Sequence, residues 1–350
     1  KLDSNNENKI ILIAISPNDQ HIVVGEEYGT IKILNLKSGE CLNIIEEDNR
    51  DVIYLEISND GASFISINLS DFYYEGSIKT WDLKTGKRIS TIEVNDQEIN
   101  SGVSSPDSKH IVTGYKDGII KIWDLQTGKC LKKLEEKSQF IFAIAISPDN
   151  KYLFSVSEGG IIKMWDIKTE KCLNTLNNHL GVVYSIAISP DVKYIISGSN
   201  DDTISIWDID SGMLLKTLKE GETYGEVIFV KVSPNALYVI SLSTGYYRQK
   251  GAIKTWDLKS GKCLNIIETN NDISSPLISH DSKYIVTANE KGIIKTWDIK
   301  SGECLNTLET NNDSFAFVIS SDSKYIVTGS KEGKLKMWGI ISGEYFKTLN

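Results

Sequence analysis

The sequence contains few of the residues that build metal or redox sites, with 4 histidines, 5 cysteines and 3 methionines among 350 residues. It has no Cys-x-x-Cys pair and no Cys/His cluster, which argues against a zinc site. No apolar stretch reaches the roughly 18 residues of a transmembrane helix. The net charge of −9 lacks the basic excess with which nucleic-acid binders neutralise phosphates. These absences disfavour metalloenzymes, membrane-spanning proteins and general nucleic-acid binders.

Proline is scarce, at 6 residues, and helix-favouring alanine is uncommon. Isoleucine, threonine, tyrosine and valine are frequent, and these residue types favour strands over helices. Glycine is common, at 26 residues, which fits a chain with many reversals. The composition therefore predicts a protein built mainly of β-strands.

All 7 tryptophans occupy the same phase of an internal repeat. Six are followed by Asp and the last by Gly339, while Leu34-Asn35 marks an eighth, degenerate position. Successive positions are 41 to 49 residues apart, close to the period of repeats that fold into four-stranded propeller blades. The tryptophans are Trp81, Trp123, Trp165, Trp207, Trp256, Trp297 and Trp338.

Each period predicts four strands. Around Trp165, the run from Ile141 to Ser147 predicts an innermost strand a, and Tyr152 to Ser155 predicts strand b. Ile161 to Trp165 predicts strand c, and Cys172 to Leu176 predicts an outer strand d. Turn residues separate these runs. Strands a and b are nearly continuous apolar runs, so both of their faces are expected to be buried between neighbouring blades.

Two of these periods, SPDNKYLFSVSEGGIIKMWDIKTEKCLNTL and SPDVKYIISGSNDDTISIWDIDSGMLLKTL, resemble WD (WD40) repeats, and the resemblance covers essentially the whole chain. It implies an all-β, WD40-type β-propeller with four-stranded antiparallel blades. Seven blades are the habit of the family, but counting gives eight here, which a propeller allows. We predict one propeller over residues 1–350, with blades at about 9–50, 51–92, 93–134, 135–176, 177–218, 219–267, 268–308 and 309–350.

The five cysteines occupy one equivalent position in five repeats, at the start of strand d. Such positions in neighbouring blades are expected to lie too far apart for a disulfide. We interpret them as small apolar residues of the outer strand. Unpaired cysteines fit a reducing compartment, so a cytoplasmic location is expected. They are Cys41, Cys130, Cys172, Cys263 and Cys304.

The resemblance implies a hydrogen-bonded His, Ser/Thr, Asp and Trp tetrad within a blade, and one blade carries all four residues. A Ser/His/Asp set can also suggest a catalytic triad, but the resemblance explains the same residues as a buried structural network. The blade of Trp123 keeps only Thr113 and Asp117 beside its tryptophan. Apolar packing is therefore expected to carry most of the stability. The complete tetrad is His179, Ser197, Asp201 and Trp207.

A lysine stands two residues before the tryptophan in six blades. This set could form an anion-binding ring, but a solvated blade edge is the preferred interpretation. The remaining histidines, His21, His110 and His280, share no metal-ligand spacing and are expected at the surface. The lysines are Lys79, Lys121, Lys163, Lys254, Lys295 and Lys336.

Two b–c connections are longer than the others and each contains a tyrosine pair. Ser66 to Trp81 and Ser241 to Trp256 span 15 residues, where Ser197 to Trp207 spans 10. The insertions fall in blades two and six, which a closed ring places opposite each other. Repeat positions also match at offsets of 173 to 175 residues, which suggests a duplicated four-blade half. The inserted residues are Tyr73, Tyr74, Tyr246 and Tyr247, with Arg248 beside the second pair.

In the family, the b–c loops and the start of strand a line one face of the disc, called the top, around the central channel. Aligning each strand a on its terminal serine puts one residue per blade at this mouth. The set is largely apolar and aromatic, and such residues are enriched in binding hot spots. The residues are Ile11, Ile53, Asn100, Phe142, Tyr184, Ile228, Ser274 and Phe315.

We interpret the chain as a non-catalytic scaffold or recognition module that binds a protein or peptide on this top face. It is expected to need no cofactor and to bind neither nucleic acid nor membrane. One alternative is a sensor or regulatory domain of a larger nucleotide-switch signalling protein, because Lys1 to Asn6 resembles the end of a strand d cut from a longer chain. A second alternative, a propeller enzyme, needs converging acids, bases or metal ligands at the mouth. An extracellular carbohydrate or ligand binder is disfavoured by the free cysteines.

Overall fold

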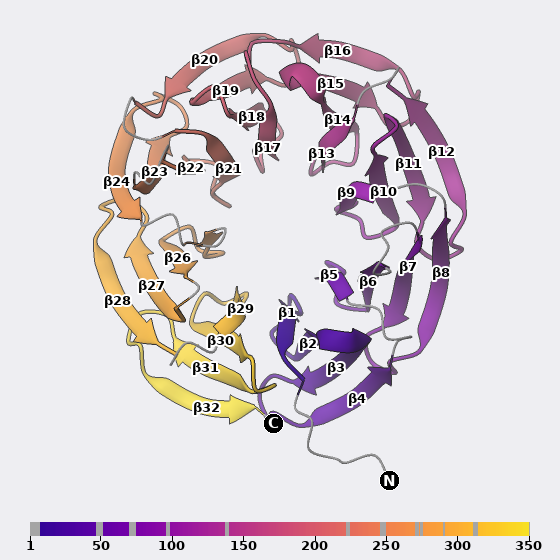
Figure 1. Cartoon of the computed structure of the whole chain (residues 1–350), viewed down its shortest axis with the longest axis vertical. Coiled ribbons are helices and arrows are strands. Elements are labelled where there is room, and N and C mark those ends of the chain that lie inside the picture. The colour runs from indigo at the N-terminus through magenta and orange to yellow at the C-terminus, as the bar shows by residue number, and fades with distance from the viewer. Residues whose placement is uncertain are drawn as a thin grey trace.

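The computed structural model describes residues 8–46, 52–69, 75–95, 99–136, 140–221, 225–245, 250–269, 273, 276–289, 291–310 and 314–349. They form eight four-stranded antiparallel sheets that stand as blades around a ring (Figure 1). The predicted all-β, eight-bladed propeller is confirmed. Over these ranges the only helical segments are two 3-10 turns, η1 (Glu27–Gly29) and η2 (Glu158–Gly160), so no helix of the described chain could cross a bilayer.

Within every blade the strands pair in chain order, from strand a at the centre of the ring to strand d at its rim (Figure 1). The a strands are β1 (Ile10–Ile15), β5 (Val52–Ile57), β9 (Ile99–Ser104), β13 (Ile141–Ile146), β17 (Val183–Ile188), β21 (Val227–Val232), β25 (Leu277–Ile278) and β29 (Ser314–Ile319). The b strands are β2 (His21–Glu26), β6 (Ser63–Leu69), β10 (His110–Tyr115), β14 (Tyr152–Ser157), β18 (Tyr194–Ser199), β22 (Tyr238–Ser243), β26 (Tyr284–Ala288) and β30 (Tyr325–Ser330).

The two outer strands of each blade complete the sheets. The c strands are β3 (Thr30–Asn35), β7 (Glu75–Asp82), β11 (Ile119–Asp124), β15 (Ile161–Asp166), β19 (Thr203–Asp208), β23 (Gly251–Asp257), β27 (Ile293–Asp298) and β31 (Leu335–Gly339). The d strands are β4 (Cys41–Glu46), β8 (Arg88–Asn95), β12 (Cys130–Glu135), β16 (Cys172–Leu176), β20 (Leu214–Lys219), β24 (Cys263–Thr269), β28 (Cys304–Glu309) and β32 (Tyr345–Leu349).

Burial differs between the two inner strands of a blade. Strand b is buried as expected: all six residues of β14 are buried. The expectation that strand a is equally buried is wrong, because most residues of β1 and β17 keep partial exposure. Strand a has no strand partner on its inner side, so its side chains line the central channel. The channel wall is therefore made of strand a side chains.

The apolar core lies between blades, and each cluster combines residues of two neighbours. Ile10 and Leu34 of the first blade pack in one cluster with Val327 and Met337 of the last blade. The ring is therefore closed by the same kind of packing that joins consecutive blades, such as Ile196 of the fifth blade with Trp256 of the sixth. Burying such side chains contributes about 1.5–3 kcal/mol each, so this seam is a substantial part of the fold.

A polar contact also recurs between neighbouring blades. The third residue of strand d reaches the backbone of the next blade's c–d turn. Lys132 donates to the carbonyl oxygens of Ile167 and Lys168, at 2.6 and 3.2 Å. At the ring closure, Lys347 donates to the carbonyl of Leu36 at 3.2 Å. We call these contacts the d-strand latches. Further latches are made by Asn43, Lys216 and Asn265.

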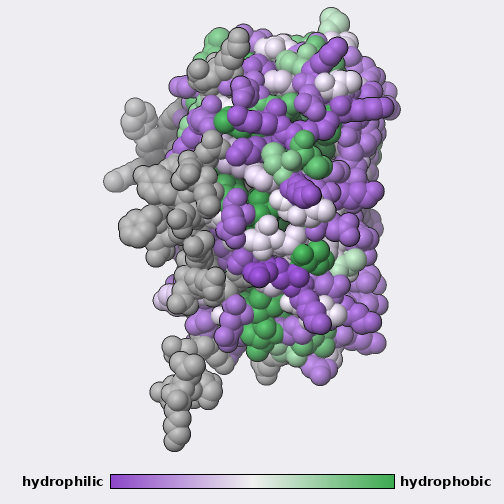
Figure 2. Space-filling view, turned by 90° about the vertical axis from the view of Figure 1, so that its right-hand side faces the viewer, coloured by the Kyte–Doolittle hydropathy of each residue, from purple (hydrophilic) through white to green (hydrophobic). Residues whose placement is uncertain are grey.

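The rim of the disc mixes polar and apolar side chains, as Figure 2 shows for one side. The five cysteines are free and lie at the start of their d strands, as predicted. They are followed by partly exposed leucines such as Leu131 and Leu173. Lysines and glutamates between them interrupt the apolar surface, which protects these outer edges from pairing with another chain.

Candidate functional site

A β-bulge displaces the second residue of strand a in seven blades. In the fourth blade, for example, Ile141 pairs with Ser157 and Ala143 with Val156, so Phe142 has no partner. A bulged residue is left unpaired in the ladder, and a bulge bends its strand and can re-aim the side chain. The bulged residues are the seven described members of the set placed at the channel mouth from the sequence: Ile11, Ile53, Asn100, Phe142, Tyr184, Ile228 and Phe315.

Several bulged side chains are exposed although they are large and apolar. Ile53 is 51% exposed and Tyr184 is 41% exposed. Phe142 is half-buried, and its ring centroid lies 4.7 Å from that of Phe140. Asn100 instead links two blades, because its Nδ2 donates to the carbonyl of Ile141 at 2.8 Å. The bulges therefore present a discontinuous apolar ring with one polar member.

Other predicted members of this face cannot be placed. Tyr73, Tyr74, Tyr246, Tyr247 and Arg248 lie outside the described residues, as does Ser274. Phe315 is placed in strand β29 by its backbone, at a bulge, and its side chain is not described. The two tyrosine-containing connections begin after β6 and β22, on blades that Figure 1 shows across the ring from each other.

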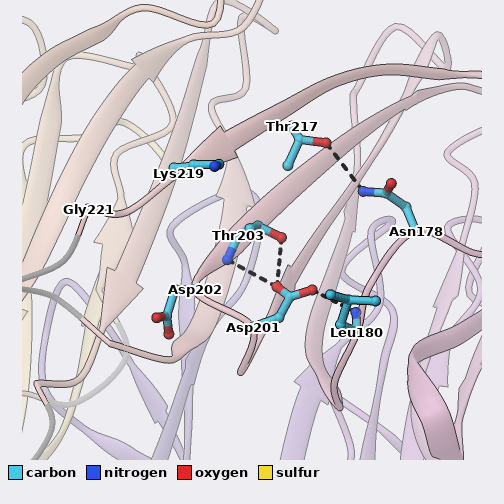
Figure 3. A pocket seen from close by; sticks show the side chains of 8 residues that line it. All are labelled: Asn178, Leu180, Asp201, Asp202, Thr203, Thr217, Lys219 and Gly221. Carbon is cyan, nitrogen blue, oxygen red and sulfur yellow. Dashed lines mark hydrogen bonds between the residues drawn. The ribbon is translucent and has the colours of Figure 1, made fainter.

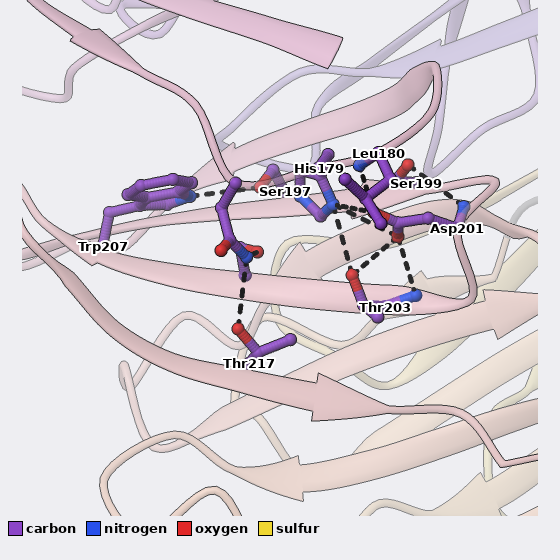
Figure 4. Close-up of polar contacts among 10 residues, drawn as sticks. His179, Leu180, Ser197, Ser199, Asp201, Thr203, Trp207 and Thr217 are labelled. Carbon is purple, nitrogen blue, oxygen red and sulfur yellow. Dashed lines mark hydrogen bonds and ion pairs between the residues drawn. The ribbon is translucent and has the colours of Figure 1, made fainter.

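The predicted tetrad is present in the fifth blade (Figure 4). His179 Nδ1 lies 3.0 Å from Asp201 Oδ2, and His179 Nε2 lies 2.8 Å from Ser197 Oγ. Trp207 Nε1 donates to the same Ser197 oxygen at 3.2 Å. Since the indole is donor only, the serine hydroxyl donates to Nε2, and the histidine proton is assigned to Nδ1, facing Asp201.

Asp201 is held in its ionised form by this network. Burial opposes ionisation, but hydrogen bonds from His179, Thr203 and the Leu180 amide outweigh it and lower the pKa of the carboxyl. Ser197 is fully buried, and its oxygen already contacts Trp207 and His179. A substrate cannot reach a hydroxyl in this position, so the geometry is that of a structural network rather than a nucleophile with its base.

Part of the tetrad persists in every blade that has a tryptophan, including blades for which the sequence pattern did not indicate it. Each indole N–H donates to a serine or threonine hydroxyl on strand b, at 2.9 to 3.2 Å. A hydroxyl on strand b opposite a tryptophan on strand c is the signal that could have revealed it. The acceptors are Ser66, Thr113, Ser155, Ser197, Ser241, Thr287 and Thr328.

Two blades replace the histidine with a buried glutamate. Ser241 Oγ donates to Glu220 Oε1 at 2.5 Å, and Ser155 donates to Glu136 in the same way. Glu220 also pairs with Lys254, whose Nζ lies 2.8 Å from Oε2. Lys163 pairs with Glu136 at 3.2 Å. These glutamates come from the connection between one blade and the next, so each network ties two blades together.

The prediction that the lysines before the tryptophans form a solvated edge is wrong for part of the set. Lys254 and Lys79 are buried. Lys254 and Lys121 also lie over the ring of the tryptophan two residues later, with Nζ 5.5 Å from the centroid in both cases. A buried ammonium needs a partner of opposite charge. The partner of Lys254 is Glu220, which is more than 30 residues away in sequence. A local pattern could not show this pairing.

Comparison with known proteins identifies the family. Residues 103–340, more than half of the chain, match the family described as nucleolar protein 10-like, N-terminal domain, a β-propeller. The chain belongs to this family. The predicted WD-repeat relationship is thereby confirmed.

The chain is also similar to eukaryotic translation initiation factor 3 subunit I. The human and mouse proteins are 27% and 26% identical to it over 109 residues, which is 31% of this chain and 32% of each relative. The chain thus matches about a third of the length of these relatives. A crystal structure of the computationally designed Ika8 protein has a TM-score of 0.76 at 24% identity, covering 96% of this chain and 98% of that one, and shows the fold alone.

This propeller has an open pocket of about 530 Å³ beside its tetrad (Figure 3). Asn178, Asp201 and Thr217 line it, and Leu180 at its edge is 96% exposed. Thr203 and the Leu180 amide already donate to Asp201, so the pocket meets a satisfied carboxylate. Within the described ranges, no three His, Cys, Asp or Glu residues group closely enough to hold a metal ion.

Proposed function

We propose that this propeller is a non-catalytic interaction platform that binds a protein or peptide segment across the bulged, top end of its channel. The observation that carries the proposal is the set of β-bulges at one end of the ring, which leaves Tyr184 and Ile228 unpaired and exposed and Phe142 unpaired and half-buried. A large apolar side chain that a bulge exposes gains nothing for folding, but it is suited to anchor a partner.

The tyrosine-containing connections extend this face in the proposal. Tyr73 and Tyr74 flank it on one side, and Tyr246, Tyr247 and Arg248 flank it on the other. Because the connections belong to blades across the ring, a bound segment would lie across the channel mouth between them. Tyr and Arg are the residue types that most often dominate binding energy at interfaces.

The charge and the relatives support a protein partner. The net charge of −9 disfavours a nucleic acid or an anionic membrane. The relative from translation initiation is by name a subunit of a larger factor.

We propose that the propeller uses no cofactor and catalyses no reaction, since the Ser/His/Asp set is a buried structural network. The free cysteines favour a reducing, cytoplasmic compartment, and the family description favours the nucleolus; cell fractionation would decide between them.

Affinity capture from native lysate tests the top face. A triple variant with Ile53, Tyr184 and Ile228 changed to alanine is expected to lose a partner that the unchanged chain retains. The matched control changes three rim leucines of similar exposure, Leu131, Leu173 and Leu215, and is expected to retain it. Loss in the control with retention in the test variant would move the binding surface to the rim and overturn the proposal.

A variant with the four tyrosines changed to alanine tests the flanking connections separately. The proposal expects weaker capture than with the unchanged chain, at an unaltered melting temperature. Equal capture by the tyrosine variant would limit the binding surface to the bulged residues.

A further inference from the structure

The channel wall carries two charges at equivalent places in the two halves of the chain. Glu56 on β5 and Lys231 on β21 each stand two residues before the serine that follows their strand. These strands lie on opposite sides of the ring (Figure 1). The same position is apolar in the other blades, where it is occupied by Ala14, Val103, Ala145, Ala187, Leu277 and Val318.

Glu56 faces a pocket of about 470 Å³ at the end of the channel away from the bulges. Strands β1, β5 and β29 supply its walls, through apolar side chains such as Ile13, Leu55 and Val318. The a–b turns supply its rim, through Pro17, Asn59, His280 and Ser321. The pocket is thus an apolar cavity with one carboxylate on its wall, and it is separate from the top face.

The carboxylate is oriented by two neutral hydroxyl groups. Tyr54 and Ser104 both donate to Glu56 Oε2. Burial, together with the Glu56 charge, raises the pKa of Tyr54, so the phenol stays protonated and keeps donating. No donor within the described ranges reaches Oε1, and no cation there forms an ion pair with Glu56. The carboxylate therefore faces the pocket without a counter-ion from the part of the chain that the structure describes.

Lys231 makes the opposite wall unsuitable for the same ligand. Lys231 keeps an exposed surface. The protein around it nevertheless removes part of the water that would stabilise the charged form, and this lowers the pKa of Lys231. A cation in the channel is attracted to the β5 side and repelled from the β21 side. The two halves of the ring thus differ in charge at positions that are otherwise alike.

We propose that the Glu56 pocket receives the basic side chain, lysine or arginine, of a partner protein that approaches the a–b turn face. The aliphatic stem of such a side chain packs against Ile13, Leu55 and Val318, and its charged head pairs with Glu56. A basic side chain combines these two parts, an apolar stem and a charged tip. The site is independent of the top face and does not require that face to bind anything.

The pocket can be tested with defined peptides by saturation-transfer NMR. The probes are acetylated and amidated Gly-Gly-X-Gly-Gly peptides with X as arginine, lysine or citrulline, the neutral counterpart of arginine. The arginine or lysine peptide is expected to bind saturably, and the citrulline peptide about ten- to a hundredfold more weakly, as for the loss of one charge-assisted hydrogen bond. Equal binding of arginine and citrulline peptides, or binding of none, overturns the proposal.

Two variants locate the binding. Glu56→Gln removes the charge but keeps an oxygen that accepts from Tyr54 and Ser104, so the fold should persist. This variant is expected to bind the basic peptides about ten- to a hundredfold more weakly, by the same argument, whereas Lys231→Met should not weaken their binding. Tyr184→Ala, on the top face, should leave peptide binding unchanged. If Glu56→Gln binds the basic peptides as tightly as the unchanged chain does, or if Tyr184→Ala abolishes their binding, the Glu56 site is excluded.

Discussion

Lys254 Nζ lies 2.8 Å from Glu220 Oε2, and both side chains are almost completely buried. The glutamate belongs to the end of the fifth blade and the lysine to strand c of the sixth. Glu220 also accepts from Ser241, which in turn accepts from Trp256. In the fifth blade, His179 and Asp201 continue the network from the strand b serine. In the sixth blade, the ion pair of Glu220 and Lys254 takes their place and lies across a blade seam.

Breaking this pair should be costly. Lys254→Met leaves Glu220 buried without its counter-ion, and the expected loss is about 3–5 kcal/mol of unfolding free energy. Chemical denaturation measures it. Lys133→Met, which removes an exposed pair with Glu135, should change stability little. The double variant Glu220→Gln/Lys254→Met should recover much of the loss, and a double variant as unstable as Lys254→Met would contradict this account.

The tetrad should make stability depend on pH below the ordinary range of an aspartate. The pKa of Asp201 is lower in the folded chain than in the unfolded chain. Its stabilising contribution is therefore complete above pH of about 4 and is lost as the pH falls through the folded-state pKa. The unfolding free energies of the unchanged chain and of Asp201→Asn, measured from neutral pH downward, should converge. A constant difference would show that the Asp201 charge is not involved.

The indole–hydroxyl bonds should be measurable one blade at a time. Trp81 Nε1 donates to Ser66 Oγ at 2.9 Å, and both atoms are buried. Ser66→Ala removes this acceptor. Leaving that donor unpaired should cost about 1–3 kcal/mol. A double-mutant cycle with Trp81→Phe isolates the bond, since phenylalanine has no donor. A coupling energy near zero would mean that packing alone places Trp81.

The d-strand latches should matter most where no peptide bond joins the blades. Lys347→Met removes the latch between the last and first blades, and Lys132→Met removes the equivalent latch between the third and fourth. Hydrogen exchange is expected to rise in β1 and β32 for Lys347→Met. For Lys132→Met the increase should be smaller, because the chain itself tethers those two blades. Equal increases in both variants would show that the closure needs no latch.

The repeat itself could be predicted from the sequence because its signals are local. The phase of Trp81 to Trp338, the turn residues between strands and the apolar runs determine the number of blades and the order of strands. The alignment on the terminal serine also placed Phe142 and Tyr184 at equivalent positions, and the structure shows what these positions share, a β-bulge. No sequence pattern revealed the bulge, because it arises from pairing with the neighbouring strand.

The buried charges could not be predicted because their partners are distant. Lys254 looks like any exposed lysine on strand c until Glu220 is brought beside it across the seam. Glu56, which is only partly buried, looks like one polar residue in an inner strand until Ser104 and the pocket walls are brought beside it. The expectation that apolar packing carries most of the stability stays a prediction. The indole–hydroxyl bond was not expected in every blade with a tryptophan, because a hydroxyl on strand b and an indole on strand c meet only when the two strands are in register, as Ser155 and Trp165 do.

Every blade of this ring is one uninterrupted stretch of chain, and the closing seam uses the same packing and the same latch as an internal seam. The position of the two chain ends is therefore arbitrary with respect to the architecture. The ends could be joined and the chain reopened between any two other blades without cutting a sheet. Such circular permutants would keep all eight blades intact, and comparing their stabilities would measure each seam of the ring in turn.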